Sequence, residues 1–559
     1  KAFFEHDAPA PAALGRELLV LEPARPGVEP RSLLDAGTGL IGSPVASWDG
    51  SEIVFSHVPA GERFFKLFRI GREGGDLERL TEGPWHDYDP AILPDGRIVF
   101  ASTRIGSRDE YHGNTTRSLF VLDRQTRSIR PLTRHIAGDS SPVVTSDGAI
   151  AFVRADNFLE RAKVETHIHT VLPDGTAGRV LVGPRRGEIS YDPKHAAEAD
   201  ALWLRNLGFG SPAPLPDGRI ACISHEGIVI SGPGFAEATA LRSDVAPFDL
   251  APCSKDHLLM SSLGGAIGLL ELAAGHVVLI HREPGTRLHS PILLAPRPRP
   301  PILPSELERT SEDPDSTGYL LCTDIRQGRQ GAIDRERVVA VRIFAGEPFA
   351  LRSARHPYGH IGTEGIELGT APVANDGSFW VRVPADRALA IQAVDADGRS
   401  VVNSLSWLYV RPNETRSCTG CHALRDEAPE SRPVLAMRAP PVDLTGGAEP
   451  HRFRANNAAN GGVLNLQLDR FREAASIDLL STVLVREGDD LRDTPPARKH
   501  ELERLQGMLR DGSVDARVSA ARRLAILRDR SAAPSLARAL DDESGDVRLA
   551  AALALASSG

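Results

Sequence analysis

The chain has 559 residues, of which 41% are hydrophobic, and a formal net charge of −9 at pH 7. A single hydrophobic core does not grow to this length, so we expect several domains. The mildly acidic chain has no basic block, which argues against nucleic-acid binding, and no apolar run approaches the roughly 20 residues of a transmembrane helix. Its five cysteines are too few for a disulfide framework.

Residues 1–304 contain a repeated unit that predicts a β-propeller. The unit consists of Ser-Pro or Asp-Pro, a short gap, Asp-Gly and a run of alternating apolar residues. In each clear copy we expect Asp-Gly to form the hairpin turn between two short strands, because glycine tolerates the positive φ of such a turn. Clear copies begin at Ser43, Asp89, Ser141 and Ser211, and weaker copies start near Pro252 and at Ser290.

An outer hairpin alternates with this inner unit. Six inner and six outer units predict six blades, and because an outer unit comes first, the Leu18 region should complete the blade that begins at Ser290. This closure removes an exposed sheet edge. The alternative is an open pair of β-sandwiches, because the spacing of the units is uneven. The outer hairpin is clearest from Leu119 to Thr133, and related segments start near Leu18, Leu67, Ile168, Ile228 and Ile267.

After a stiff, proline-rich linker at residues 297–301, residues 305–445 predict a small antiparallel, sandwich-like β domain that carries the haem motif described next. Phe379, Val381 and Val383 lie two residues apart and so share one face of a strand. Strands are expected at residues 338–344, 379–383, 390–394, 400–405 and 406–410.

The sequence Cys418-Thr419-Gly420-Cys421-His422 follows the last of these strands and is the attachment motif for one covalent c-type haem. The thiols of Cys418 and Cys421 add across the two vinyl groups of the porphyrin, and the imidazole of His422 then faces the iron as the proximal ligand. A zinc site would need a second CxxC or a histidine pair at ligand spacing, which the sequence lacks. Half a zinc site and a redox disulfide are the alternatives.

The sixth iron ligand decides whether such a haem carries electrons or binds a substrate. Met437, shortly after the motif, and His360, in a polar loop before it, are the two candidate distal ligands. The alternatives are gap filling in a core for Met437 and solvent exposure for His360, which together leave the distal position open. Trp380, Trp407 and Tyr409 either wall one face of the haem or fill the sandwich core.

Residues 446–496 form a connecting segment, and residues 497–559 predict α-helices that resemble HEAT repeats. The sequence Asp515-Ala516-Arg517-Val518 returns 31 residues later as Asp546-Val547-Arg548-Leu549, and each aspartate is a suitable helix N-cap. HEAT surfaces usually bind proteins, so we expect a partner protein. Because a solenoid needs about three units, either the chain is truncated or the helices dock on the haem domain.

Several motifs in and before the haem sequence occur together: Gly369-Thr370-Ala371-Pro372-Val373, Asp376-Gly377-Ser378, Val383-Pro384-Ala385, Gln392, Asp395-Ala396-Asp397-Gly398 and Ser417-Cys418-Thr419-Gly420-Cys421-His422. In combination they resemble the hydrazine synthase alpha-subunit family. The resemblance, over roughly residues 40–440, implies a six-bladed propeller and a middle domain with one c-type haem, which the synthase subunit uses catalytically. That subunit also has a second c-type haem and a tyrosine ligand just after the first motif. This chain has no second CxxCH and no tyrosine in residues 423–427, so His422 is the expected proximal ligand.

These features indicate one of two classes of protein. The first is a monohaem c-type cytochrome, a redox protein that transfers electrons or performs haem-based redox chemistry on a small inorganic molecule, with the propeller covering the haem and a redox partner protein. In the chemical variant it would be a haem-dependent oxidoreductase. The second class is a protein-interaction scaffold of propeller and HEAT-like units, in which CxxCH is a structural zinc site or a relic.

The haem motif also predicts the compartment. Covalent haem attachment is completed outside the cytoplasm, so we expect a periplasmic or otherwise extracytoplasmic protein. The chain begins at Lys1 rather than at a methionine, as it would after removal of a signal peptide.

Overall fold

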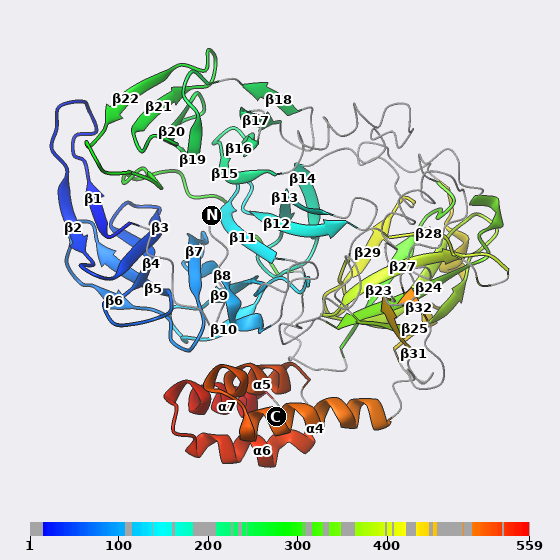
Figure 1. Cartoon of the computed structure of the whole chain (residues 1–559). Coiled ribbons are helices and arrows are strands. Elements are labelled where there is room, and N and C mark those ends of the chain that lie inside the picture. The colour runs from blue at the N-terminus through cyan, green and yellow to red at the C-terminus, as the bar shows by residue number, and fades with distance from the viewer. Residues whose placement is uncertain are drawn as a thin grey trace.

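A computed structural model of the chain has a mainly β architecture with α-helices near the C-terminus (Figure 1). The residues that the structure describes are 15–106, 115–136, 138–158, 163–182, 208–224, 227–232, 238–241, 243–305, 307, 316–327, 335–347, 364–396, 398, 400–404, 407–420, 432–445, 451–455, 484–485, 495–527 and 530–557.

Five four-stranded antiparallel sheets follow one another along residues 40–281. Within each sheet the strands pair in chain order, and the first strands of successive sheets contact one another. Figure 1 shows the sheets arranged around a common centre, as the blades of a propeller are. The blades are β3 (Leu40–Ala46), β4 (Glu52–Val58), β5 (Lys66–Gly71) and β6 (Glu78–Arg79); β7 (Asp87–Ile92), β8 (Ile98–Ser102), β9 (Ser118–Leu122) and β10 (Ile129–Pro131); β11 (Gly138–Val144), β12 (Ile150–Phe158), β13 (Lys163–Val171) and β14 (Arg179–Val182); β15 (Gly210–Pro214), β16 (Ile220–Ser224), β17 (Gly227–Ser231) and β18 (Ala238–Leu241); and β19 (Pro247–Pro252), β20 (His257–Ser262), β21 (Ile267–Glu271) and β22 (Val277–His281).

The repeated unit of the sequence corresponds to the first hairpin of a blade. In the four clear copies Asp-Gly forms the turn, and φ is 71°, 92°, 88° and 91° at Gly50, Gly96, Gly148 and Gly218. The residue before each proline also has a positive φ, of 47°, 51°, 52° and 50° at Ser43, Asp89, Ser141 and Ser211. The strand register shifts around these residues, so each unit carries a β-bulge in its first strand.

The beginning and the end of the propeller region pack together, as the offset of the repeats predicts. β1 (Glu17–Val20) and β2 (Arg31–Asp35) form a two-stranded sheet, and Leu18 shares a hydrophobic cluster with Ile292 and Leu294. Ser290 Oγ donates to Asp249 Oδ2 of the fifth blade at 3.1 Å. Unlike the other inner units, however, residues 287–305 contain no strand. Prolines recur in this stretch and lack the N–H that a central strand donates.

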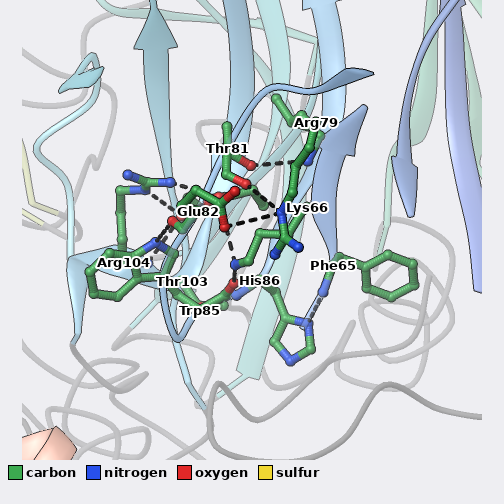
Figure 2. Close-up of polar contacts among 12 residues, drawn as sticks. Phe65, Lys66, Arg79, Thr81, Glu82, Trp85, His86, Thr103 and Arg104 are labelled. Carbon is green, nitrogen blue, oxygen red and sulfur yellow. Dashed lines mark hydrogen bonds and ion pairs between the residues drawn. The ribbon is translucent and has the colours of Figure 1, made fainter. Parts of the chain in front are cut away.

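A cluster of buried charges joins the first two of these blades (Figure 2). Lys66 is 1% exposed, donates from Nζ to the Trp85 carbonyl and lies 4.0 Å from Asp87 Oδ2. Asp87 also accepts hydrogen bonds of 2.6 Å from Arg104 Nη2 and from Ser102 Oγ. Burial by itself would raise the pKa of Asp87, but the charges of Arg104 and Lys66 lower it. One buried carboxylate therefore pairs with both cations.

Two further sheets share one hydrophobic core and form the middle domain, as predicted for a sandwich. Phe379, Val381 and Val383 all lie in this core, on the predicted common face. The first sheet has the order β29–β23–β26–β30, with β23 (Thr317–Cys322), β26 (Phe379–Pro384), β29 (Thr415–Cys418) and β30 (Val442–Asp443). The second has the order β28–β27–β24–β25–β31–β32, with β24 (Ala340–Glu347), β25 (Glu364–Pro372), β27 (Ala388–Val394), β28 (Ser400–Asn403), β31 (His451–Ala455) and β32 (Leu484–Val485).

The middle domain differs from the prediction in two respects. It is not purely antiparallel, because β29 and β30 run parallel to their neighbours β23 and β26. The described residues 407–414 that precede β29 form no strand. In the region expected as a strand at 406–410, the described residues contain only an isolated bridge between Leu408 and Leu389. β31 and β32 extend the second sheet into the residues assigned to the connecting segment.

The C-terminal region is helical, as predicted, and has its own core of leucine, alanine and valine side chains. One detail of the prediction is wrong: the residue that caps α5 is Ser513, whose Oγ accepts from the Ala516 N–H at 3.3 Å, whereas Asp515 lies inside the helix. The assignment to HEAT repeats stays a prediction. The helices are α4 (Pro495–Asp511), α5 (Val514–Leu527), α6 (Ala533–Arg538) and α7 (Gly545–Ser557), and short 3-10 helices lie at Thr103–Ile105, Arg335–Arg337, Leu435–Arg438, Arg530–Ala532 and Ala539–Asp541.

Candidate haem-attachment site

The first cysteine of the attachment motif lies at the end of an edge strand of the middle domain. β29 runs parallel to β23, and Cys418 is in register with Cys322. Just beyond β23, the Thr323 N–H donates to the Cys418 carbonyl at 3.0 Å, and the Thr323 hydroxyl donates to the Thr419 carbonyl at 3.2 Å. Cys418 is an exposed residue, whereas Cys322 is 1% exposed in the core. The fold thus places Cys418 at the edge of the sheet, on a backbone that Thr323 holds.

Gly420 packs against the turn of residues 324–327. A Cβ atom at this position would lie 2.6 Å from the Gln327 carbonyl oxygen and 2.9 Å from the Asp324 carbonyl oxygen, where ordinary contacts begin at 3.4 Å. The motif therefore has no space for a side chain at this position. Cys421 and His422, the second attachment residue and the proximal ligand, lie outside the described residues, so their roles stay predictions.

Cys418 is the described cysteine best suited to react. A hydrogen bond from the Cys322 thiol lowers the pKa of the Cys418 thiol, and the positive charge of Arg416 lowers it further. Burial of Cys418 opposes these two effects without cancelling them, whereas burial raises the pKa of Cys222 to about 12 and also raises the pKa of Cys253. Because the thiolate is the nucleophilic form of cysteine, a thiol of lowered pKa fits covalent attachment to a vinyl group.

Arg416 ties the attachment strand to the propeller. Its Nη1 donates to the Tyr409 carbonyl at 3.0 Å, and its Nη2 donates to the Gly178 carbonyl, in the turn between β13 and β14, at 2.5 Å. Both acceptors are neutral, and burial lowers the pKa of Arg416. Tyr409 is 2% exposed, and its hydroxyl donates to the Gly175 carbonyl at 3.2 Å. Tyr409 and Arg416 thus connect the middle domain to the propeller through the turn between β13 and β14.

Further contacts fix the same segment to the third blade. Arg411 Nε donates to the Asp174 carbonyl at 3.3 Å, and the Ala177 N–H donates to Glu414 Oε1 at 3.0 Å. His135 Nε2 donates to the carbonyl of Trp407 at 2.8 Å. Residues 407–416, which lead into β29, are therefore held against the propeller along their whole length.

A buried ion pair lies on the propeller side of this junction. Arg154 donates from Nε and Nη2 to the two carboxylate oxygens of Asp139, at 2.7 and 2.9 Å, and both residues are buried. Burial, aided by the charge of Arg154, lowers the pKa of His135 well below its ordinary value, so this histidine is neutral at pH 7. Burial raises the pKa of Tyr409 to about 12. The junction thus combines one buried ion pair with a neutral histidine and with Arg416, whose two acceptors are backbone carbonyls.

The two candidate distal ligands have different outcomes. Met437 lies on the short helix Leu435–Arg438 and is 53% exposed, so it does not fill a core gap. The Leu435 N–H donates to Asp376 Oδ2 at 2.8 Å, which fixes this helix to a hairpin turn. The Ile325 N–H donates to the carbonyl of Gly377 in the same turn at 2.8 Å, next to the segment on which Gly420 packs. Met437 is therefore near the attachment motif but free of the core. His360 lies outside the described residues.

The aromatic residues and the interdomain contacts were only partly foreseen. Tyr409 is buried at the junction with the propeller, and Trp380 lies on the opposite face of its sheet from Cys418, because Trp380 pairs with Leu321 rather than with Cys322. The roles of His135, Arg154 and Arg416 were missed. Only Arg416 left a signal, since a charged residue two positions before the motif projects from β29 on the same side as Cys418.

Two absences complete the description. Within the described ranges no three His, Cys, Asp or Glu side chains are grouped so that they could hold a metal ion. In the same part of the chain no helix is long and apolar enough to cross a membrane.

Comparisons with known proteins converge on one family. The family model described as the hydrazine synthase alpha subunit middle domain matches residues 336–423, which include the attachment motif. Hydrazine synthase subunit alpha of Kuenenia stuttgartiensis is 22% identical over 489 residues, which cover 68% of this chain and 59% of that relative. The chain thus spans less than two thirds of that relative's length.

The comparison with solved structures agrees with this result. The structure of Kuenenia stuttgartiensis hydrazine synthase has a TM-score of 0.62 at 19% identity and covers 73% of this chain and 66% of that chain, which indicates a shared fold. TolB from Acinetobacter baumannii has a TM-score of 0.34 at 15% identity, with 50% of this chain and 66% of that chain covered.

Proposed function

We propose that this chain, which is hydrazine synthase alpha-like, is a monohaem c-type redox protein. Cys418 and Cys421 hold the haem by two thioether bonds, and His422 binds its iron. The haem supplies one-electron redox chemistry, with a potential that depends on the axial ligands and on burial. The observation that carries the proposal is Cys418, an exposed residue whose thiol has a lowered pKa, fixed on β29 within the family-matched residues 336–423.

The described residues have definite tasks in this proposal. Gly420 seats the motif against residues 324–327, and Arg416 holds β29 to the third blade. The haem is therefore attached beside the propeller, whose loops can cover one of its faces. Met437 is 53% exposed, so we infer a distal position that is open or weakly held.

An open distal position favours chemistry on a small molecule over simple electron transfer. The name of the relative, hydrazine synthase subunit alpha, suggests a small nitrogen compound as the substrate class. A redox partner protein would exchange electrons with the haem, and the C-terminal helices offer HEAT-like surfaces for a partner. Covalent attachment implies an extracytoplasmic, periplasmic location.

Haem attachment is tested by intact mass after expression with haem-maturation machinery. The mass should exceed that of the apoprotein by one haem, and the haem stain should survive denaturation. Cys418→Ser together with Cys421→Ser should abolish both signals, whereas Cys222→Ser, which changes a buried propeller cysteine, should leave them intact. An unmodified mass for the parent chain would contradict the proposal and favour the interaction scaffold.

Ligation is tested by spectroscopy of the loaded protein. His422→Ala should change the spectrum strongly, because it removes the proximal nitrogen and leaves both thioethers. Met437→Ala and His360→Ala should change it little, and the ferrous protein should bind carbon monoxide completely. A low-spin ferrous spectrum that carbon monoxide does not alter would mean two firm protein ligands, and the protein would then be an electron carrier.

A further inference from the structure

A second thiol lies directly beside the first attachment cysteine. Cys322 and Cys418 are register partners on the parallel strands β23 and β29, so their side chains project from the same face of the sheet. Neighbouring strands are about 4.8 Å apart, within the roughly 4.4–6.8 Å between Cα atoms that a disulfide spans. Neither residue is in a disulfide here, and the Cys322 thiol donates a hydrogen bond to the sulfur of Cys418.

The two cysteines differ in access to solvent. Cys418 is exposed at the sheet edge, whereas Cys322 is 1% exposed and belongs to the core cluster of the middle domain. A soluble oxidant can therefore reach Cys418 first, and among the described cysteines Cys322 is then the nearest thiol for the second step. The other described cysteines, Cys222 and Cys253, lie in the propeller on β16 and after β19. β29 has only four residues and pairs with one neighbouring strand of its sheet, so Cys418 lies at a sheet edge.

We propose that Cys322 and Cys418 form a reversible disulfide in the haem-free chain. In the forward direction Cys418 Sγ attacks a small-molecule disulfide such as glutathione disulfide and releases one thiol. Cys322 Sγ then attacks the mixed disulfide and releases the second thiol. The two cysteines lose two electrons and two protons, and two glutathione molecules gain them. A dithiol reverses the reaction.

This bond has a consequence for cofactor loading, a step that rests on the proposed function. The Cys418 sulfur is already bonded to its own Cβ and can form only one more bond. That bond is either the disulfide to Cys322 or the thioether to a vinyl carbon. The disulfide thus protects an exposed thiol of the haem-free chain from irreversible oxidation in an oxidising compartment. Attachment waits until a reductant frees Cys418, so Cys322 makes cofactor loading redox-dependent.

The disulfide is tested by peptide mapping of the haem-free chain carrying Cys421→Ser, so that the motif peptide holds one cysteine. The chain is reduced, incubated with glutathione disulfide, quenched with N-ethylmaleimide and digested with trypsin without reduction. We expect residues 310–326 to be linked to residues 417–425. Cys322→Ser should abolish this linkage, and Cys222→Ser should leave it unchanged. If Cys418 carries only glutathione and no cross-link forms, the proposal is overturned. This readout needs no variant of Cys322, so it holds even if Cys322→Ser fails to fold.

Covalent uptake of ferrous haem by the same Cys421→Ser chain tests the consequence. The oxidised chain should take up at least about tenfold less haem than the chain first treated with a phosphine, and Cys322→Ser should remove the difference. Equal uptake by cross-linked and reduced chains would overturn the gating role. If the Cys421→Ser chain cross-links but the parent chain, with Cys421 intact, takes up no haem even when reduced, the disulfide is supported and the proposed haem function is overturned. If the parent chain takes up haem but no cross-link forms, the haem function is supported and the disulfide is overturned.

Discussion

Substitution of the glycine inside the attachment motif is the sharpest test of the site geometry. In Gly420→Ala the new Cβ would lie 2.6 Å from the Gln327 carbonyl oxygen, so the loop must move by roughly 0.8 Å to reach ordinary contact at 3.4 Å. Overpacking of this kind costs about 1–3 kcal/mol. The same movement lengthens the hydrogen bonds from Thr323 to the carbonyls of Cys418 and Thr419, each worth about 1 kcal/mol. The local cost is therefore about 2–4 kcal/mol.

Hydrogen exchange measures this cost in the haem-free chain. A local destabilisation of about 2–4 kcal/mol should lower the protection of the Thr323 N–H by about 30-fold to 1,000-fold, at about 1.4 kcal/mol per factor of ten. Haem stoichiometry after maturation should fall as well, because Cys418 and Cys421 are no longer presented together. Thr419→Ala is the matched control, because its carbonyl, not its side chain, accepts the hydrogen bond. If Gly420→Ala matches Thr419→Ala in both protection and haem content, the packing argument is refuted.

Three further outcomes test other parts of the structure. Asp87→Asn should lower the free energy of unfolding by about 3–5 kcal/mol, since it breaks a buried ion cluster; Asp95→Asn, in an ion pair near the surface, should cost under about 1 kcal/mol by denaturant titration. Burial lowers the pKa of His135, so the stability that the neutral histidine contributes is present above pH 6.5 and is lost as the pH falls below 6.5. His135→Gln should therefore bring the urea midpoints measured at pH 7.5 and pH 5 closer together. A difference between the two midpoints as large as in the parent chain would contradict this role of His135. In reduced, haem-free protein at pH 7.5, iodoacetamide should label Cys418 faster than Cys253, because the thiol pKa is lowered at Cys418 and raised at Cys253. Faster labelling of Cys253 would contradict the hydrogen bond and the charge that lower the pKa of Cys418.

The blade pattern could be read from the sequence because its signals are local. Asp-Gly needs only its own backbone to form a turn, and Ser or Asp before proline marks the bulge of the first strand. The failure at Ser290 has a similarly local cause, since prolines after it remove strand donors. The attachment motif is local too, because thioether chemistry fixes the spacing of Cys418, Cys421 and His422.

Which residues are neighbours across strands and between domains could not be predicted from the sequence. Cys322 and Cys418 are 96 positions apart, and only the parallel register of β23 and β29 brings them together. A sequence pattern with period two predicts which face a residue takes, but not which strand lies beside it or in which direction that strand runs. The prediction of a purely antiparallel domain was therefore wrong for the sheet that contains β29 and β30, which run parallel to their neighbours.

By itself the sequence determined the repeated blade hairpins, the helical C-terminus and the haem-attachment motif, because each depends on the chemistry of residues close together in the chain. Only the tertiary structure decided that Arg416 bonds to Gly178 and that the thiol of Cys322 lies beside that of Cys418. These contacts join segments far apart in the chain, and burial, which sets the pKa of His135 and Tyr409, exists only once the two domains have packed.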